Sequence, residues 1–357
     1  MRIVQIIDSL ETGGAERMAL NYANELSNLI EFSGLVVTRN EGMLTENVNK
    51  NVDYFFLDKK STFDIKALFK LRNYISKNKI NFLHAHSTSF FFAFLLKLTL
   101  PKIKLIWHDH YGDSEFLSNR PTLLFKIVIP FFDGVIVVNQ KLKLWNQNIL
   151  RFKNTICLPN FVIFENNEIK STFLAGKNNK RIICLANLRP QKDHFMLLGI
   201  AKQLMNTNPD WTFHLVGKDF KDEYSDKLKN AIYDFKLNEN VFVYDSKKDI
   251  QNILNQSAIA ILTSKSEGLP VAILEYGLNS KAVISTNVGD ISTILINNFN
   301  GYLVESGNVE NFYNALSGLI ENTELITTFG KNLNETVNKK FNIKIVVQEY
   351  LEWLKKN

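Results

Sequence analysis

The chain has 357 residues, of which 45% are hydrophobic and 22% are charged, a composition typical of soluble globular proteins. This length exceeds what one hydrophobic core usually serves, so we expect two domains of about 150 to 180 residues each. The two cysteines, Cys157 and Cys184, each lie in an apolar run. This pattern does not indicate a disulfide framework, and together with the lack of a signal-peptide layout it favours a cytoplasmic location.

The net charge of +6 is unevenly distributed along the chain. Residues 1–165 carry 20 Lys and Arg against 15 Asp and Glu, whereas the remainder carries 22 against 21. The positive excess is scattered and no nucleic-acid-binding motif accompanies it, so we do not expect nucleic acid as a partner. Two interpretations stay open, namely contact with an anionic membrane surface or anionic acceptor, and an ordinary solvated surface.

In the first half, apolar runs alternate with helical patterns, which predicts a parallel α/β sheet. The predicted strands are residues 2–8, 32–38, 52–57, 82–86, 104–107, 134–138 and 155–158, and the predicted helices are 15–28, 64–79 and 141–149. Two further apolar runs, residues 90–100 and 121–132, are too short for a bilayer, which needs about 20 residues. Each is either a helix packed on the sheet or a partly exposed face that touches lipid.

A polar stretch precedes a second alternation of the same kind, which indicates a linker and a second α/β domain. We place the domains at residues 1–165 and 181–340, with a linker at 166–180 and a last helix at 341–357. The predicted strands are residues 181–186, 212–216, 241–244, 258–263 and 281–286, with a hairpin-like strand at 300–304. The predicted helices are residues 194–206, 223–235, 248–255, 271–278, 309–319, 324–334 and 343–356.

Residues 264–277, SKSEGLPVAILEYG, join the predicted strand 258–263 to a helix. Pro270 suits the first turn of that helix, where its missing N–H costs nothing. The loop therefore places backbone N–H groups at the positive end of a helix dipole, which is an anion site. Glu267 and Glu275 flank it, and carboxylates accept hydrogen bonds from sugar hydroxyls. A nucleotide-diphosphate sugar, with phosphate between two hydroxyl-rich groups, has the matching shape.

The segment EGLPVAILE, with seven residues between its glutamates, resembles the signature of the family 4 retaining glycosyltransferases. The loop GGAER, the turn at residues 159–162 and the stretches at 281–290 and 300–304 resemble further parts of that family. The resemblance covers nearly the whole chain. It implies the GT-B fold, an α/β architecture of two Rossmann-like, doubly wound domains that face a central cleft. In this fold the C-terminal helix crosses back to the N-terminal domain.

The resemblance implies transfer of a hexose from a nucleotide-diphosphate sugar to an acceptor hydroxyl, with retention at the anomeric carbon. UDP is the default nucleotide, carrying a hexose or an N-acetylhexosamine. Lys192, Glu267 and His108 are implied as catalytic residues, and Glu275 as the ligand of the ribose. The resemblance also assigns donor binding to residues in three loops, namely Gly13, Gly14, Arg189, Lys192, Glu267, Gly268, Leu269, Pro270 and Val271. His110 shares the role of His108 if the chain there stays extended.

The sequence departs from the family pattern at one point of the diphosphate site. Ala186 and Asn187 stand where a glycine and an arginine are usual, so one positive charge is missing. Either Arg189 reaches the phosphates instead, or Lys192 and the helix dipole suffice. The family usually works without a metal, and no Asp-x-Asp cluster is present to hold one, so we expect neither a metal nor another cofactor.

Alternatives remain for the activity and for the acceptor. A catalytically silent GT-B subunit would scaffold a partner transferase, and a sugar-nucleotide epimerase of the same fold would need further acid and base carboxylates. The expected acceptor is a glycan or a lipid-linked saccharide in surface-polysaccharide biosynthesis, met at the cytoplasmic face of the membrane. A glycosidase-like double displacement is rejected, because the family's two glutamates contact opposite ends of the donor.

Overall fold

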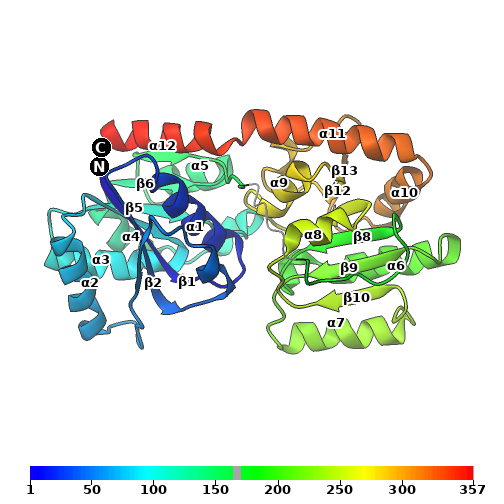
Figure 1. The fold of residues 1–357 in the computed structure, drawn as a ribbon, viewed down its shortest axis with the longest axis horizontal. Coiled ribbons are helices and arrows are strands. Elements are labelled where there is room, and N and C mark those ends of the chain that lie inside the picture. The colour runs from blue at the N-terminus through cyan, green and yellow to red at the C-terminus, as the bar shows by residue number, and fades with distance from the viewer. Residues whose placement is uncertain (164–169, 357) are drawn as a thin grey trace. The chain divides into compact units, whose positions relative to one another are not determined.

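The computed structural model describes residues 1–163 and 170–356, which form two compact units (Figure 1). One unit is Met1–Phe161 together with Ile343–Asn357, and the other is Val162–Asn342. The chain thus leaves the first unit after Phe161 and returns to it at Ile343. Part of the predicted linker, residues 166–169, lies outside the described residues. The rest packs on the second unit, where the Ser171 and Thr172 amides donate to Asp249 Oδ2.

The N-terminal unit is built on a seven-stranded parallel sheet with the order β3-β2-β1-β4-β5-β6-β7. Its strands are β1 (Arg2–Ser9), β2 (Phe32–Asn40), β3 (Asp53–Phe56), β4 (Phe82–His86), β5 (Lys104–Asp109), β6 (Gly134–Val137) and β7 (Thr155–Cys157). The strand order changes direction between β1 and β4. In open α/β sheets this switch point is where ligands bind, outside the carboxyl ends of the strands.

The helices of this unit are α1 (Gly14–Leu26), α2 (Ile65–Lys77), α3 (Phe90–Thr99), α4 (Leu123–Val128), α5 (Gln140–Asn148) and α12 (Ile343–Lys356). The last of these confirms that the C-terminal helix returns to the N-terminal domain. Its apolar face carries Val347, Tyr350 and Leu354, which share one buried cluster with Tyr22 of α1. Because α12 completes this core, the N-terminal unit needs the end of the chain to bury its own helix α1.

The two short apolar runs have different surroundings. In α3, Phe90, Phe92 and Leu96 are buried, as expected for a helix packed on the sheet. In α4 only Val128 is buried, whereas Leu123 has a relative exposure of 74%. Across the described residues, no helix combines the length and the apolar character that a membrane span requires.

The C-terminal unit has a six-stranded parallel sheet with the order β10-β9-β8-β11-β12-β13. Its strands are β8 (Arg181–Leu185), β9 (Thr212–Val216), β10 (Val241–Tyr244), β11 (Ile259–Leu262), β12 (Ala282–Thr286) and β13 (Tyr302–Val304). The hairpin-like strand predicted at residues 300–304 is wrong, because β13 runs parallel to β12. Asn300 folds the connection instead, accepting from Ile296 N at 2.6 Å and donating to Ile294 O at 3.0 Å.

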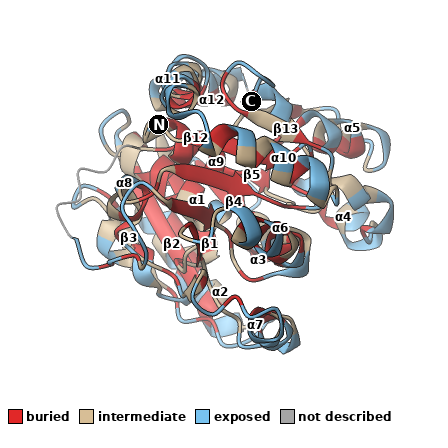
Figure 2. Cartoon of the chain, turned by 90° about the vertical axis from the view of Figure 1, so that its right-hand side faces the viewer, coloured by how far each residue is buried: buried red, intermediate tan, exposed pale blue. Residues whose placement is uncertain are grey.

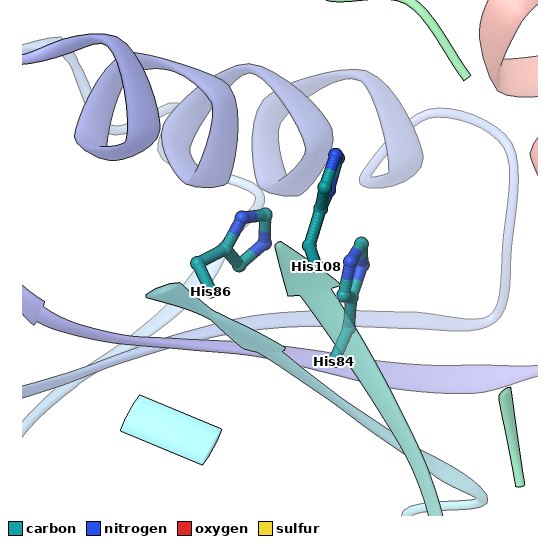
Figure 3. A group of neighbouring side chains, drawn as sticks. All are labelled: His84, His86 and His108. Atoms are coloured by element: carbon teal, nitrogen blue, oxygen red, sulfur yellow. The ribbon is translucent and has the colours of Figure 1, made fainter. Parts of the chain in front are cut away.

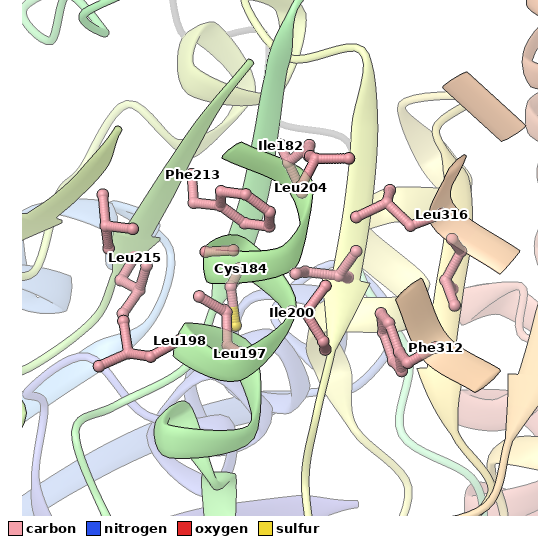
Figure 4. Close-up of a cluster of buried hydrophobic side chains, with 14 of the residues drawn as sticks. Ile182, Cys184, Leu197, Leu198, Ile200, Leu204, Phe213, Leu215, Phe312 and Leu316 are labelled. Carbon is pink, nitrogen blue, oxygen red and sulfur yellow. The ribbon is translucent and has the colours of Figure 1, made fainter. Parts of the chain in front are cut away.

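Six helices and a large hydrophobic core accompany this sheet. The helices are α6 (His194–Thr207), α7 (Glu223–Asp234), α8 (Ile250–Asn255), α9 (Val271–Leu278), α10 (Val309–Ile320) and α11 (Thr323–Lys340). The core includes Cys184, Leu197, Phe213 and Phe312 (Figure 4). Burial raises the pKa of the Cys184 thiol to about 12, and both cysteines are free, which agrees with the absence of a disulfide framework.

Two local predictions need correction near the candidate site. The strand predicted to end at Trp107 continues through Asp109, so His108 lies within β5 and is buried. Pro270 precedes helix α9 as its N-cap, with extended backbone angles, instead of occupying the first turn. The inner strands of both sheets, such as β5, β9 and β11, are almost entirely buried, and Figure 2 shows buried strands at the centre of the chain. Functional side chains are therefore expected at the ends of these strands.

Candidate active site

Three loops meet at the carboxyl edge of the C-terminal sheet. The first follows β8 and contains Lys192, the second follows β11 and contains Glu267, and the third follows β12 and contains Gly289. The strand order of this sheet changes direction between β8 and β11. Lys192 and Glu267 therefore lie on opposite sides of the switch point, which is the expected place for a ligand.

Glu267 is the central carboxylate of this site. Its side chain is buried, with a relative exposure of 4%. Lys192 Nζ donates to Glu267 Oε1 at 2.5 Å, and Ser264 Oγ donates to the same oxygen at 2.6 Å. A buried carboxylate requires such partners, since an unpaired charge would be expensive in this environment. The pair brings together the two predicted residues that come from different loops.

Hydroxyl groups at the strand ends tie the loops to one another. Thr263 Oγ1 donates to the carbonyl oxygens of Lys192 and Asp193 at 3.1 Å each, and Thr286 Oγ1 donates to Ser264 O at 2.7 Å. Asp193, in the left-handed region at φ 48°, then accepts from Met196 N as the cap of α6. The positions of Lys192 and Glu267 are thus fixed by backbone contacts and not only by their own ion pair.

Gly289 allows the third loop to approach the second. Its φ of +58° lies in the left-handed region, which favours glycine. A Cβ atom at this position would lie 2.2 Å from Glu267 O and 2.7 Å from Gly268 O. The next residue continues the contact, since Asp290 N donates to Gly268 O at 3.0 Å. The close approach of the two loops near Glu267 therefore requires glycine at position 289, because any larger residue would collide with the backbone.

Helix α9 begins directly after this loop. Its N-cap, Pro270, makes no side-chain capping hydrogen bond, so the start of the helix presents backbone N–H groups and the positive end of the helix dipole. Tyr276 anchors the helix, because its hydroxyl accepts from Leu185 N at 2.6 Å. Glu275 is half-buried on the same helix. Gly268, Leu269 and Val271 thus lie where an anion would meet the helix.

Asn187, which stands where the family usually has an arginine, has a structural role. Asn187 Oδ1 accepts from Lys218 N at 2.8 Å, which joins the loop after β8 to the loop after β9. Gly217 makes this close approach possible, since a Cβ there would lie 2.2 Å from Ala186 O. Arg189 is exposed, and its guanidinium lies 4.7 Å from the centre of the Phe220 ring.

In the N-terminal unit, four histidines gather at the ends of β4 and β5. The side chains of His84, His86 and His108 point from these strands towards α1 (Figure 3). His86 Nε2 donates to Gln5 Oε1 at 2.8 Å, and His86 Nδ1 lies in hydrogen-bond contact with His110 Nε2 at 3.0 Å. The His108 and His110 rings stack with centroids 3.9 Å apart. The two histidines therefore do lie on the same side of the chain.

Burial lowers the pKa of all four of these histidines, for His110 to about 3. They are therefore neutral at pH 7 and can exchange hydrogen bonds without carrying charge. Neither ring nitrogen of His108 has a hydrogen-bond partner among the described residues. His108 is fully buried whereas His110 is only partly so, which makes His110 the more accessible of the two.

One histidine group has the spacing of metal ligands within the described part of the chain. His84, His86 and His108 each offer a nitrogen within 4.8 Å of the others. Three zinc ligands would approach more closely, to about 3.4 Å, because Zn–N bonds are about 2.1 Å long. Both His86 nitrogens are engaged, and the His84 and His108 rings stack at 8° instead of converging. The arrangement suits a hydrogen-bonded stack better than a metal centre, and metal independence stays a prediction.

A buried ion pair holds the segment that follows His110. Arg120 Nη1 lies 2.7 Å from Asp109 Oδ2, and Arg120 Nη2 lies 2.9 Å from Asp109 Oδ1. The guanidinium also lies within 6 Å of four aromatic rings, those of Trp107, Tyr111, Phe125 and Trp145. This two-point pairing fixes both ends of residues 109–120, since Asp109 belongs to β5.

The glycine loop lies at the start of α1. Gly13 is the N-cap, in extended conformation, and Gly14 is the first residue of the helix. The Glu16 carboxylate folds back over this turn, since a Cβ on Gly13 would lie 2.2 Å from Glu16 Oε2. The structure thus places both glycines beside the switch point of the N-terminal sheet, but in a different unit from Lys192 and Glu267.

Two parallel α/β units with a C-terminal helix that returns to the first define a GT-B protein. A family description of group 1 glycosyltransferases matches residues 165–336, and one of glycosyltransferase family 4 matches residues 12–163. Together the two matches cover most of the chain. The chain therefore belongs to the family 4, or group 1, glycosyltransferases.

Several relatives are similar along nearly their full length. An Escherichia coli UDP-Gal:alpha-D-GlcNAc-diphosphoundecaprenol alpha-1,3-galactosyltransferase is 25% identical, over 92% of this chain and 90% of the relative. The Erwinia amylovora amylovoran biosynthesis glycosyltransferase AmsD is 24% identical over 92% and 93%. The solved structure of Anabaena Alr3699/HepE with UDP-glucose superposes with a TM-score of 0.83 at 19% identity, covering both chains fully. TarM gives 0.79 at 15%, covering 99% and 98%. These structures confirm the fold.

Some residues of the site were not singled out from the sequence. Ser264 lies three residues before Glu267, which begins the segment EGLPVAILE. Apart from this proximity, nothing in the sequence indicates the hydrogen bond between the two residues. The pairing of Asp109 with Arg120 spans eleven positions and could not be read from either residue alone. Thr263 and Thr286 stand at the ends of two apolar strands. A threonine at such a position is only a weak sequence signal for the loop contacts that their hydroxyls make.

Proposed function

We propose that the protein transfers a hexose, with retention, from a UDP-sugar to a hydroxyl group of a glycan or a lipid-linked saccharide. The observation that carries the proposal is the Lys192–Glu267 pair at the switch point, beside the start of α9. It combines a cation for a diphosphate, a helix terminus for the same anion and a carboxylate for sugar hydroxyls. UDP and a hexose agree with the name of the E. coli galactosyltransferase and with the UDP-glucose bound in the HepE structure.

In the proposed complex the diphosphate lies against the Gly268–Val271 backbone and Lys192. Glu275 accepts from the ribose hydroxyls, and Glu267 accepts from hydroxyls of the transferred sugar. The bond from the anomeric carbon to the diphosphate breaks while the acceptor oxygen bonds to that carbon, and the acceptor proton leaves with the nucleoside diphosphate. Lys192 stabilises the charge that develops on the leaving group. Arg189, exposed on the same loop as Lys192, is the second cation available to it.

We assign acceptor binding to the N-terminal unit, where His108 and His110 lie near the carboxyl edge of the sheet, and we keep Gly13 and Gly14, at the start of α1, as candidate donor-binding residues. Neutral histidines suit this role, because they can exchange hydrogen bonds with hydroxyls without carrying charge. Accessibility favours His110 over His108 for direct contact with the sugar. No metal or other cofactor takes part in the proposed reaction.

We further propose peripheral contact with an anionic membrane at the cytoplasmic face, through α4. Its exposed side chains include Leu123, Leu124 and Ile127, with Lys126 on the same short helix. Apolar groups beside a cation are the combination that binds an anionic lipid surface. Such contact would suit a lipid-linked acceptor in surface-polysaccharide biosynthesis, like the diphosphoundecaprenol in the name of the E. coli relative.

The test is release of nucleoside diphosphate from a panel of UDP, GDP and ADP sugars, followed by the anomeric configuration of the product by NMR. UDP-sugar turnover with a retained configuration, unchanged by a chelator, is expected. Glu275→Ala should weaken UDP binding in a thermal-shift assay, because the ribose loses its acceptor. An inverted product would contradict retention. UDP binding without turnover would instead favour the silent subunit, and an epimerised UDP-sugar would favour the epimerase.

A further inference from the structure

The carboxyl edge of the N-terminal sheet carries a charged group that the proposed donor chemistry does not use. It consists of Asp8 at the end of β1, Arg39 at the end of β2, Lys59 just after β3 and Thr88 just after β4. Thr88 Oγ1 donates to Asp8 Oδ2 at 2.6 Å, which links the strands on the two sides of the switch point. The group therefore lies where an open α/β sheet binds its ligand.

The Asp8 carboxylate is already supplied with hydrogen bonds. Thr38 Oγ1 donates to Asp8 Oδ1 at 2.5 Å, and Thr88 donates to the other oxygen. The cations remain further away, with Lys59 Nζ at 3.7 Å and Arg39 Nε at 3.8 Å from Asp8 Oδ1. These separations exceed the usual 2.7–3.2 Å of an N–H···O bond. The two cations neutralise Asp8 in part, but they keep their N–H donors for another acceptor.

Lys59 is unusual among the lysines because it is buried, with a relative exposure of 6%. Its ammonium lies 4.5 Å from the centre of the Phe92 ring, which forms an apolar wall beside it. Burial lowers the pKa of Lys59, and the proximity of Arg39 lowers it as well, whereas Asp8 raises it. Two cations thus lie close to the single carboxylate of Asp8, and Asp64 also raises the pKa of Lys59. A bound anion would stabilise both cations.

We propose that Arg39 and Lys59 form a binding site for a phosphate group of the acceptor. The inference deepens the proposed function, on which it rests, by giving the acceptor substrate a phosphate or diphosphate ester. A guanidinium offers a planar fork of donors that matches a phosphate, and an ammonium adds a second charge-assisted bond. Asp8, held by Thr88, would keep the two cations in place and leave their N–H donors available for the phosphate.

The test is the binding of inorganic pyrophosphate to the full chain by isothermal titration calorimetry, with UDP at saturation to fill the donor site. Wild type should bind pyrophosphate, and Arg39→Gln and Lys59→Met should each weaken it by about tenfold or more, the loss of a charge-assisted hydrogen bond. Lys60→Met is the matched control, since it removes the same charge from an exposed neighbour that pairs with Asp58. It should leave the affinity unchanged.

Arg39→Gln keeps the test decisive if Lys59→Met disturbs the fold, because the Arg39 side chain is 37% exposed. No binding by wild type, or an equal loss in Lys60→Met, would overturn the site. If UDP itself does not bind, the proposed function fails. Pyrophosphate is then titrated into Lys192→Met without UDP, and this titration still shows whether Arg39 and Lys59 form a phosphate site. Geranyl diphosphate separates the sources: tighter binding than pyrophosphate indicates a lipid-linked acceptor, and equal binding indicates a free phosphate ester.

Discussion

Lys192 Nζ lies 2.5 Å from Glu267 Oε1, and the two residues belong to loops on opposite sides of the β8–β11 switch point. Each charge neutralises the other in a largely buried setting. A diphosphate that enters this site therefore competes with Glu267 for the Lys192 ammonium. In the proposed reaction this exchange has a use, because a carboxylate released from Lys192 can accept from the hydroxyls of the sugar that arrives with the diphosphate.

Gly289→Ala should reduce turnover by at least tenfold. The added Cβ has no room beside Glu267 O and the left-handed φ disfavours alanine, so the loop that carries Glu267 must move. A displacement of about 1 Å in a reacting group can cost about 100-fold in rate. Initial rates of UDP release measure the effect. Gly318→Ala in α10 is the control: open space surrounds its Cβ, and alanine in a helix should add up to about 1 kcal/mol of stability.

Arg120→Met should lower the free energy of unfolding of the N-terminal unit by about 3–5 kcal/mol, because it leaves Asp109 buried without its cation. Urea titration followed by tryptophan fluorescence measures the loss. Asp109→Asn combined with Arg120→Met removes both charges and should recover part of that stability. A double variant as unstable as the sum of the single ones would show that the pair is not coupled.

Much of this fold follows from the alternation of apolar runs with helical patterns. Strands β4, β9 and β10 and helix α12 begin and end where the sequence predicts. Parallel strands are buried on both faces, so their apolar runs are continuous and easy to recognise. The direction of β13 was predicted wrongly, because three residues of strand pattern carry no information about whether the preceding connection is a hairpin or a crossover.

The candidate site was predictable only in part. Glu267 and Lys192 were found through a motif and its spacing, and the structure brings them into contact. The sequence did not indicate that His108 is buried. Strand β5 extends two residues beyond its apolar run and carries this polar side chain into the interior. The pairing of Asp8 with Arg39 and Lys59 depends on which strands are neighbours in the sheet. No local pattern encodes that order.

Stability should fall as the pH drops below about 6.5. The folded protein holds all six histidines with a lowered pKa, for His194 and His214 to about 4, whereas an unfolded histidine titrates near 6.5. The unfolded chain therefore binds more protons, and each histidine adds up to about 1.4 kcal/mol per pH unit to the slope. His214→Gln should reduce the slope of its own unit by that amount between pH 6 and pH 4.5. An unchanged slope in urea titrations would contradict this account.

Leu123→Glu with Ile127→Glu should weaken binding to phosphatidylglycerol vesicles by at least tenfold. Each exposed aliphatic side chain that enters the lipid surface contributes about 1.5–3 kcal/mol, which a carboxylate would replace with repulsion. Cosedimentation measures the effect. Tyr233→Glu, on the exposed face of α7, should bind like wild type. Equal binding by all three proteins would exclude α4 as the contact.

The measurement that tests the central claim most directly is equilibrium binding of UDP to wild type, Lys192→Met and Lys227→Met. Lys227 is an exposed lysine of α7 that pairs with Glu223, so its replacement removes the same charge away from the site. We predict that wild type and Lys227→Met bind UDP equally and that Lys192→Met binds about 10- to 100-fold more weakly, as expected for a lost charge-assisted bond to phosphate. Equal affinity in all three proteins would contradict a donor site at Lys192 and Glu267.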